Sequence, residues 1–350
     1  SLPPLPPLPS TTTAATTRAA VPSGTASQGA APHTLVLATE VPVALVINGI
    51  AHAVLMATPA DLGALALGFL LTEGIIDQAS DCYDLQIEPL SAQCVGLPEG
   101  IDAVQVDLQI AARCMARLQS KRRSMSGRTG CGVCGVESFV GLDLDCPPVP
   151  AAPWLAQVDA PTVLAAMQAL YHQQPLHHAS QSVHAAAWAD ASGQVLHVME
   201  DVGRHNALDK LIGHLAQTGQ LNPREPQAAP GFVLLSSRGS HELVRKCARV
   251  GIAALATLSA PTAMGVRMAE LTQLRLWGLC RGPSATLFAP GGIPAQPGQP
   301  HRPEPKIAAF SLCPPLVFSP WIHTMPAVTT TLACSGVRPL WAKQSNCCNF

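Results

Sequence analysis

Strands and helices alternate through the second half of the sequence, and this alternation constrains the fold more than any other feature. Between Pro161 and Leu279, apolar stretches of strand length are separated by stretches of helix length. This order predicts a mixed, largely parallel sheet covered by helices, an α/β (α+β) architecture. The predicted strands are Val183–Ala189, Val195–Glu200, Phe232–Ser236, Ile252–Leu258 and Leu274–Leu279, and the predicted helices are Pro161–Gln173, His205–Gln217, Ser240–Val250 and Thr262–Leu271.

The first half of the sequence predicts a smaller α+β unit that ends near residue 117. Asn48-Gly49 is a strong two-residue hairpin turn between apolar strands. Thr58, followed by Pro59 and Asp61, predicts a helix with Thr58 as its N-cap that runs to Gly74. The predicted strands are His33–Ala38, Val41–Val46, Ile50–Met56, Leu85–Pro89 and Ala103–Leu108.

The two ends of the chain lack these patterns. Residues 1–32 are rich in Pro, Thr and Ala, and from residue 285 proline recurs while charge and periodicity fade. Such sequences bury too little apolar surface to fold, so both ends are predicted to be disordered, with a partner-binding segment as the alternative for the tail. The predicted organisation is therefore a leader (1–32), an α+β subdomain (33–117), a linker (118–150), a mixed-sheet domain (151–284) and a tail (285–350).

Charge and hydropathy exclude several classes of protein. With 21 Lys+Arg and 22 Asp+Glu in 350 residues, the net charge of −1 argues against a general nucleic-acid binder. The mean hydropathy is +0.24, but the longest uncharged run, residues 307–337, contains four prolines that a membrane helix would not tolerate. Residues 1–30 have no apolar core of a secretory signal. We therefore expect a soluble, cytoplasmic protein.

A pair of cysteines lies between the two predicted units. Cys131 and Cys134 are flanked by glycines and follow the basic run Lys121–Arg128. Positive charge favours the thiolate, which is the reactive form of cysteine. The spacing leaves three interpretations open: redox or sulfur chemistry, half of a structural zinc site, or an ordinary cysteine pair. No second CxxC or HxxxH pattern nearby completes a zinc site.

Two strand-to-helix loops each place an arginine beside small polar residues. The first contains Arg204, His205 and Asn206, and the second contains Arg238 and Ser240. Guanidinium groups and helix N-termini both bind anions, and ligands collect where parallel strands end. The two loops together predict a site for an anionic, nucleotide-like ligand. A local cap with a salt bridge, and a plain N-cap role for Ser240, are the structural alternatives.

Other polar or reactive residues near these loops have two interpretations each. Glu200 or Asp201 could accept a hydrogen bond from a base edge or a ribose. His184 is either a packed core residue or a ligand. Cys247 and Cys280 lie in apolar patterns and are predicted to be buried as small hydrophobic residues.

Several stretches of the sequence, among them the cysteine pair and the two loops, together resemble the formate dehydrogenase accessory sulfurtransferases, the FdhD family. They occur in the family's order and cover residues 33–282. The matching stretches are Leu71–Ile76, Arg128–Gly135 with Glu137–Phe139, His184–Ala187, Glu200–Lys210, Ser236–Lys246, Ser259–Thr262 and Leu279–Arg281.

The resemblance implies a fold and a function. The second domain would be similar to cytidine deaminases, and the protein would be a homodimeric sulfurtransferase that works with a cysteine desulfurase and formate dehydrogenase. Cys131 would carry sulfur as a persulfide, with Cys134 as helper or alternate carrier. The sulfur would pass to the molybdenum (or tungsten) bis(molybdopterin guanine dinucleotide) cofactor before its insertion into formate dehydrogenase. The implied cofactor-binding residues are Leu279, Cys280, Arg281, Gly282, Pro283 and Ser284, with Arg204, His205, Asn206, Arg238 and Ser240 in the two loops; no metal is held by the protein itself.

The sequence departs from these patterns in two places. Ser284 stands where the family would have a basic residue. Zinc-dependent deaminases need a His-x-Glu motif followed by Pro-Cys-x-x-Cys, but His184 is followed by two alanines and the CxxC precedes it. Deaminase activity is therefore not expected. The remaining alternative to sulfur transfer is a non-enzymatic, zinc-stabilised interaction module that uses the CxxC.

Overall fold

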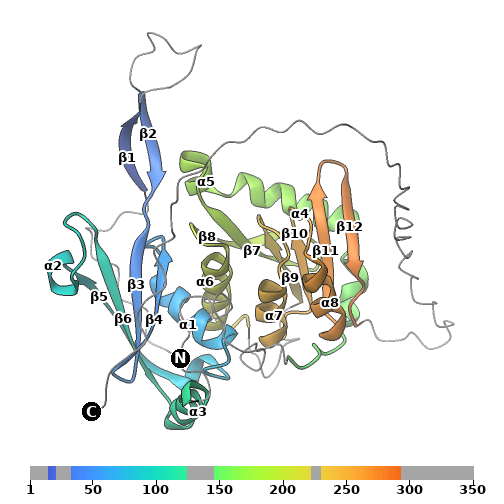
Figure 1. Cartoon of the computed structure of the whole chain (residues 1–350). Coiled ribbons are helices and arrows are strands. Elements are labelled where there is room, and N and C mark those ends of the chain that lie inside the picture. Colours follow the sequence, from blue (N-terminus) through green and yellow to red (C-terminus); the bar gives the residue numbers. More distant parts are fainter. Residues whose placement is uncertain (1–14, 21–32, 124–145, 222–229, 293–350) are drawn as a thin grey trace, which may run out of the picture. The chain divides into compact units, whose positions relative to one another are not determined.

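The computed structural model describes residues 15–20, 33–123, 146–221 and 230–292, which form a mixed α/β fold with three sheets (Figure 1). The largest sheet has six strands in the order β12-β11-β10-β9-β7-β8. Their bounds are β7 (His184–Asp190), β8 (Val195–Asp201), β9 (Gly231–Leu235), β10 (Ala254–Thr257), β11 (Arg275–Arg281) and β12 (Ser284–Ala289).

The six-stranded sheet is mixed, but it is not largely parallel as the sequence predicted. Only the β9–β10 and β10–β11 pairs are parallel, whereas β7 runs antiparallel to both β8 and β9, and β12 runs antiparallel to β11. The difference arises because a hairpin lies at each edge. Consecutive strands joined by a short turn must run antiparallel, whatever follows them in the chain.

Helices cover both faces of this sheet. α6 (Arg204–Gln217), α7 (His241–Arg249) and α8 (Ala263–Leu271) connect strands that run in the same direction, so right-handed crossovers place all three on one face. α4 (Ala160–His172) packs on the sheet from the other side (Figure 1). It begins at Asp159, whose side chain accepts a hydrogen bond from Thr162 N at 3.0 Å. Two shorter helical segments, η3 (Pro153–Gln157) and α5 (Pro175–Ser180), flank α4.

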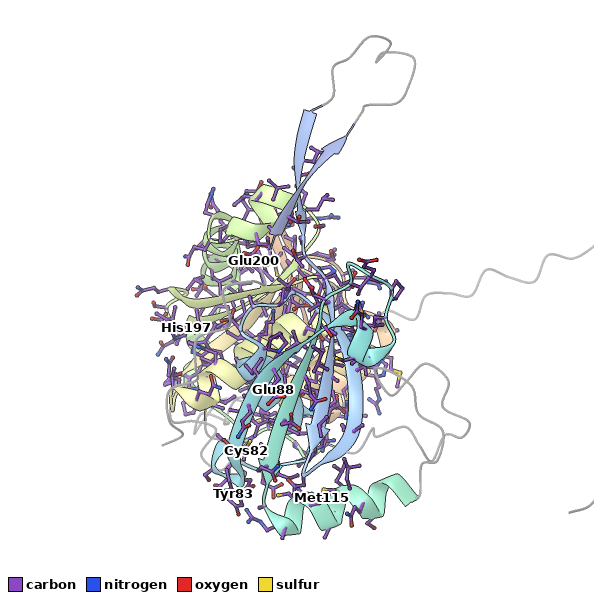
Figure 2. All side chains as sticks on the ribbon, turned by 90° about the vertical axis from the view of Figure 1, so that its left-hand side faces the viewer. Cys82, Tyr83, Glu88, Met115, His197 and Glu200 are labelled. Carbon is purple, nitrogen blue, oxygen red and sulfur yellow. The ribbon has the colours of Figure 1, made fainter. Side chains whose placement is uncertain are left out.

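The N-terminal unit is a four-stranded sheet in the order β4-β3-β6-β5. Side chains alternate along β3, with Val41, Val43, Leu45 and Ile47 buried on one face, as the period of a strand requires. On β5 the side chains of Tyr83 and Glu88 are exposed (Figure 2). The bounds are β3 (Val41–Ile47), β4 (Ile50–Ala57), α1 (Leu62–Thr72), η1 (Ala79–Asp81), β5 (Cys82–Leu90), α2 (Ala92–Val95), β6 (Ala103–Ile110) and α3 (Ala112–Arg123).

α1 joins the two units, because it packs against α6 of the six-stranded sheet. The two helices approach so closely at Gly68 and Gly213 that a Cβ at Gly68 would overlap the carbonyl of Asp209, and one at Gly213 would overlap the carbonyl of Ala64. Almost every residue of α1 is buried. A helix that is apolar all round is buried on all sides, and this one forms part of a continuous core with both sheets.

The start of α1 differs from the prediction. The helix begins at Leu62 after Asp61, which has a left-handed backbone (φ 53°), and no side chain caps it. Thr58 instead binds the other unit: its N–H donates to Asp201 Oδ2 at 3.0 Å and its hydroxyl accepts from Val202 N at 3.2 Å. Tertiary hydrogen bonds therefore take the groups that a local cap would have used. The Asn48-Gly49 hairpin is confirmed, with both residues at positive φ.

Regular structure crosses two of the predicted boundaries and also occurs within the predicted leader. β1 (Ala15–Ala20) lies within the leader predicted to be disordered and pairs antiparallel with β2 (His33–Ala38). α3 continues past residue 117 to Arg123, and β12 continues past residue 284 to Ala289. The sequence patterns of these segments are too weak to predict them. β1 and β12 form strands because each one pairs with a neighbouring strand, β2 and β11 respectively. Within the described residues, no helix is long and apolar enough to cross a membrane.

Candidate functional site

The carboxyl ends of β8, β9, β10 and β11 lie along one edge of the six-stranded sheet, because these four strands point in the same direction. The loops after them are bonded to one another. Thr262 N donates to the carbonyl of Gly239 at 3.0 Å, and Leu279 N donates to the carbonyl of Ser259 at 3.3 Å. The predicted loop at residues 236–240 therefore lies beside the loop at 258–262 and the end of β11, at the same edge of the sheet as the predicted loop at 200–206.

Arg204 and His205 form the first turn of α6 and are partly exposed. His205 Nε2 lies 3.0 Å from Glu242 Oε2 on α7, and Arg204 Nη2 lies 4.0 Å from the same oxygen. The hydrogen bond from His205 lowers the pKa of Glu242, and Coulombic interactions with His205, His241 and Arg204 lower it further. These contacts join the two loops through a carboxylate that the sequence analysis had not considered.

Asn206 supports the loop from inside. It is buried, and its Nδ2 donates to the carbonyl of Met56 at 2.7 Å and to Asp201 Oδ1 at 3.0 Å. Gly203 N also donates to Asp201 Oδ1, at 2.8 Å. The side chain of Asn206 thus fixes the turn that presents Arg204 and His205.

Arg238 and Ser240 occupy the second loop. Arg238 is exposed. Ser240 holds the N-cap position of α7, but its hydroxyl makes no capping hydrogen bond. Within the described residues its Oγ is buried and has no hydrogen-bond partner. A buried hydroxyl without a partner is unusual, and at the start of a helix it is placed to bind a ligand oxygen.

The segment from Leu279 to Ser284 turns from β11 into β12 beside these loops. Leu279 has a left-handed backbone (φ 54°), a strained conformation for a leucine that is often retained at functional sites. Cys280 is 1 % exposed and burial raises the pKa of its thiol to about 11, so only its backbone is offered to a ligand. The remaining predicted residues, Arg281, Gly282, Pro283 and Ser284, are exposed at the turn. The burial predicted for Cys280 and Cys247 is confirmed.

The carboxylates of Glu200 and Asp201 are used inside the protein. Glu200 accepts hydrogen bonds from Leu176 N at 2.9 Å and His177 N at 2.7 Å. Asp201 is fully buried and pairs with Lys210 Nζ at 2.7 Å. This geometry contradicts the interpretation that either one binds a base or a ribose.

His184 lies at the start of β7, opposite Asp201 on β8. Burial lowers its pKa, and the positive charge of Arg204 lowers it further. A neutral imidazole therefore lies near the Arg204 guanidinium of the first loop, at the same edge of the sheet.

Cys131 and Cys134 lie outside the described residues. The described residues before and after this segment, on α3 and at Cys146, contact other parts of the chain. On α3, Arg117 pairs with Asp77 at 3.0 Å and donates to the carbonyl of Ile75 at 2.9 Å. Cys146 Sγ lies 3.9 Å from the carbonyl of Arg245 on α7.

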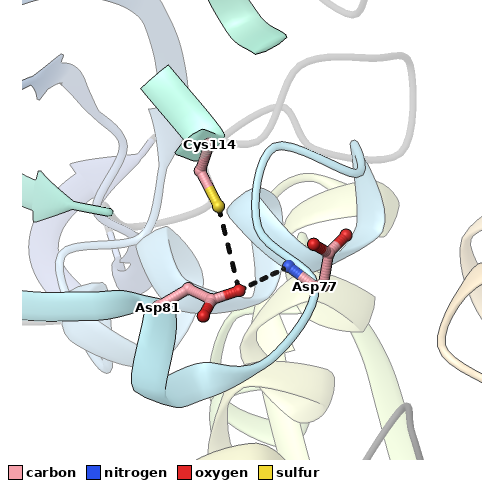
Figure 3. A group of neighbouring side chains, drawn as sticks. All are labelled: Asp77, Asp81 and Cys114. Carbon is pink, nitrogen blue, oxygen red and sulfur yellow. Dashed lines mark hydrogen bonds between the residues drawn. The ribbon is translucent and has the colours of Figure 1, made fainter. Parts of the chain in front are cut away.

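A second group of titratable side chains lies where Cys114 of α3 meets Asp77 and Asp81 (Figure 3). Asp81 accepts from Asp77 N at 3.1 Å and from Cys114 Sγ at 3.8 Å. Arg113 pairs with Asp81 and Arg117 with Asp77, so each carboxylate already has a cation. Burial raises the pKa of the Cys114 thiol, and Asp81 raises it further. The group is a charge-balanced link between α3 and the loop after α1.

Comparison with known protein families shows to which family the chain belongs. A model of the FdhD/NarQ family matches residues 38–292. The chain belongs to the FdhD/NarQ family. This match contains the cysteine pair and all of the loops described above.

Relatives within the FdhD/NarQ family span most of this chain. A "Sulfur carrier protein FdhD" from Bordetella petrii is 45% identical over 261 residues, covering 75% of this chain and 87% of the relative. A protein with the same name from Burkholderia mallei is 47% identical over 242 residues, covering 69% of this chain and 84% of the relative. A crystal structure of a putative formate dehydrogenase accessory protein from Desulfotalea psychrophila has a TM-score of 0.55 at 19% identity, covering 79% of this chain and 97% of that chain. This last likeness supports the fold.

Sequence reasoning missed Glu242 and the buried lysines. Glu242 is the third residue of the motif Ser240-His241-Glu242, where an acidic residue in a first helical turn is ordinary. Lys210 and Lys246 are buried with carboxylates, although lysine is almost always exposed. Each lysine occupies a position where the helical pattern of α6 or α7 predicts an apolar residue, and this mismatch is the signal that could have identified it as a buried charge.

Proposed function

We propose that this chain is a sulfur carrier protein required for formate dehydrogenase activity. It accepts sulfur from a cysteine desulfurase and passes it to the molybdenum bis(molybdopterin guanine dinucleotide) cofactor before that cofactor enters formate dehydrogenase. The observation that carries the proposal is membership of the FdhD/NarQ family over residues 38–292, a range in which the Cys131–Cys134 pair is present. In this role the chain acts as a sulfurtransferase in the cytoplasm, as a homodimer.

The first transfer is a thiol–persulfide exchange. The Cys131 thiolate attacks the outer sulfur of the donor's cysteine persulfide; a new S–S bond forms, the donor's S–S bond breaks and the donor leaves as a thiolate. No external oxidant or reductant is needed, because one persulfide replaces another. The basic run Lys121–Arg128 favours the attacking thiolate. Cys134 serves as helper or alternate carrier.

The cofactor that receives the sulfur is a polyanion with two guanine nucleotides, and the sheet edge has the groups to bind such a substrate. Arg204, His205 and Arg238 supply positive charge or N–H donors, and Ser240 supplies a hydroxyl with no protein partner within the described residues. Phosphate oxygens pair well with guanidinium groups and helix N-termini. The strained turn at Leu279 adds backbone groups beside the same loops.

Rescue of formate dehydrogenase tests this function. Cells that lack their own accessory protein are given the full chain, its Cys131→Ala variant or its Cys94→Ala variant, and formate oxidation is measured. Cys94 is an exposed cysteine on α2 and is the matched control. The proposal predicts rescue by the full chain and by Cys94→Ala, and none by Cys131→Ala. Equal rescue by all three would contradict the role of Cys131, and no rescue by the folded, unmodified chain would contradict the function.

A further inference from the structure

Two histidines face each other away from the edge of the six-stranded sheet where the loops meet. His197 Nδ1 on β8 lies 3.2 Å from His214 Nε2 on α6, and the two ring planes meet at 61°. Both side chains are partly exposed, and Figure 2 shows His197 on β8. His197 stands four residues before Asp201, which is roughly 13 Å along the strand from its carboxyl end. The pair is therefore separate from the loops described above.

The distance between the two ring nitrogens fits a shared metal ion. Bonds from zinc to imidazole nitrogen are about 2.0–2.1 Å long, so two neighbouring nitrogens on one ion lie roughly 2.9–3.4 Å apart. Without an ion, the same contact is a hydrogen bond between neutral imidazoles, in which one nitrogen donates and the other accepts. An ion can replace that shared proton with little movement of the rings.

Gln220 binds the other nitrogen of the His197 ring. Its amide oxygen lies 3.1 Å from His197 Nε2, and its amide nitrogen lies 2.8 Å from the same atom. When the amide accepts the Nε2 proton, Nδ1 keeps its lone pair and faces His214 as a ligand. Metal-binding histidines commonly donate their second ring N–H to a partner of this kind, which fixes the orientation of the ring.

The start of α1 places an acidic residue beside His214. Ala64, three residues after Asp61, lies against Gly213, so Asp61 is close to the turn of α6 that carries His214. Burial lowers the pKa of His214, whereas the negative charge of Asp61 raises it. Asp61 is exposed, has a left-handed backbone (φ 53°) and makes no capping hydrogen bond to the helix that follows it. Its side chain can therefore turn toward the two rings.

We propose that His197 and His214 bind a divalent transition-metal ion such as Zn²⁺, with the Asp61 carboxylate as the third ligand and water in the remaining position. Two imidazoles and one carboxylate are a set of ligands that zinc uses with one position open. Mg²⁺ and Ca²⁺ prefer oxygen ligands and are not expected to bind here. The site departs from the expectation that the protein itself holds no metal.

An ion in this place connects three elements. His197 belongs to β8, His214 to α6, and Asp61 directly precedes α1, the helix that joins the two units. The bound ion stabilises the folded chain, because the unfolded chain does not hold these ligands together. This role does not depend on the proposed sulfur transfer.

Zinc binding by the full chain tests the site. All forms carry Cys131→Ala and Cys134→Ala, so that the cysteine pair supplies no ligand, and EDTA removes bound metal before calorimetry with Zn²⁺. We expect one bound ion whose Kd rises at least ten-fold after His197→Gln or His214→Gln. The control is His172→Gln, since His172 is exposed on α4 and should leave the Kd unchanged. No zinc binding before these substitutions, or the same stoichiometry and Kd after His214→Gln, would overturn the proposal.

A second measurement covers a histidine variant that folds poorly. Asp61→Asn keeps both imidazoles and alters an exposed side chain outside the core, and we expect it to raise the Kd for Zn²⁺ about ten-fold. Zn²⁺ in excess of its Kd should also raise the urea midpoint of the His172→Gln form, and raise that of the Asp61→Asn form less at the same concentration. The same Kd and the same shift of the midpoint in both forms would contradict the site as proposed.

Discussion

At the scale of single residues, buried charge is the most unusual feature of the protein. Lys246 is 4% exposed; its Nζ lies 2.9 Å from Asp209 Oδ2, 2.8 Å from the Thr72 hydroxyl and 2.9 Å from Glu73 Oε1. Burial alone would raise the pKa of Glu73, but Lys246 and Arg245 outweigh it and lower that pKa to about 2. Each charge in the group is therefore stable only while its partners are present.

Removing the Lys246 side chain should accordingly destabilise the folded protein. We predict that Lys246→Met lowers the free energy of unfolding by about 3–5 kcal/mol, because Asp209 and Glu73 are left without their shared cation. Urea unfolding of the full chain measures the change. Arg267→Met is the control, since Arg267 pairs with Glu270 on the surface and its loss should change little. Similar effects of the two variants would contradict this account of the buried group.

At the scale of elements, the contact between α1 and α6 depends on Gly68 and Gly213. We predict that Gly213→Ala lowers the free energy of unfolding by about 3 kcal/mol or more, since its Cβ would overlap the carbonyl of Ala64 and the helices cannot separate without opening the core. Gly219→Ala is the control: it has a positive φ but open space around it, and should cost only about 1 kcal/mol. If thermal or urea unfolding gave the same loss for both, the helices would not be in close contact.

A second element-scale prediction concerns pH. His214 on α6 lies 3.2 Å from His197 on β8, and burial, followed by His197, lowers the pKa of His214. In the unfolded chain His214 therefore binds a proton near pH 6.5, whereas in the folded chain it binds one only at lower pH. The free energy of unfolding is therefore highest above pH 6.5 and falls as the pH drops below it.

His214→Gln should flatten this dependence, leaving the part that belongs to His184, whose pKa is also lowered. Urea midpoints between pH 7.5 and 5.5 measure the slope for both proteins. An identical slope in the variant and the unmodified chain would show that His214 does not contribute.

The elements also show where sequence patterns are sufficient. Asn48-Gly49 specifies its turn locally, because both residues tolerate the positive φ that the hairpin needs, and the turn was predicted correctly. Thr58 was predicted to cap α1, but its groups bind Asp201 and Val202, which are more than 140 positions away in the sequence. No local pattern encodes such a contact. The same reason explains why Glu242 was missed as the group that joins the two loops.

At the scale of the whole molecule, the two units share their buried groups. Lys210 on α6 is paired with Asp201 and also donates to the carbonyl of Thr58 at 3.0 Å, and Lys246 reaches Thr72 on α1. One continuous core contains residues of both sheets. The units are therefore expected to unfold together.

We predict a single unfolding transition for the full chain. Of the five tryptophans, Trp154, Trp188 and Trp277 belong to the unit with the six-stranded sheet, Trp321 and Trp341 lie in the tail, and residues 33–117 contain none. Tryptophan fluorescence and far-ultraviolet circular dichroism should consequently give the same urea midpoint. A loss of circular dichroism that preceded the change in fluorescence would show that the N-terminal unit unfolds on its own.

The central claim is that Cys131 carries sulfur, and mass spectrometry of the loaded protein tests it most directly. The full chain is incubated with a cysteine desulfurase and cysteine, and the peptide that contains Cys131 is analysed beside the Cys131→Ala and Cys94→Ala variants. We predict one additional sulfur on Cys131 in the unmodified chain and in Cys94→Ala, and a loss of most of the bound sulfur in Cys131→Ala. The same persulfide content in the unmodified chain and in Cys131→Ala would contradict it.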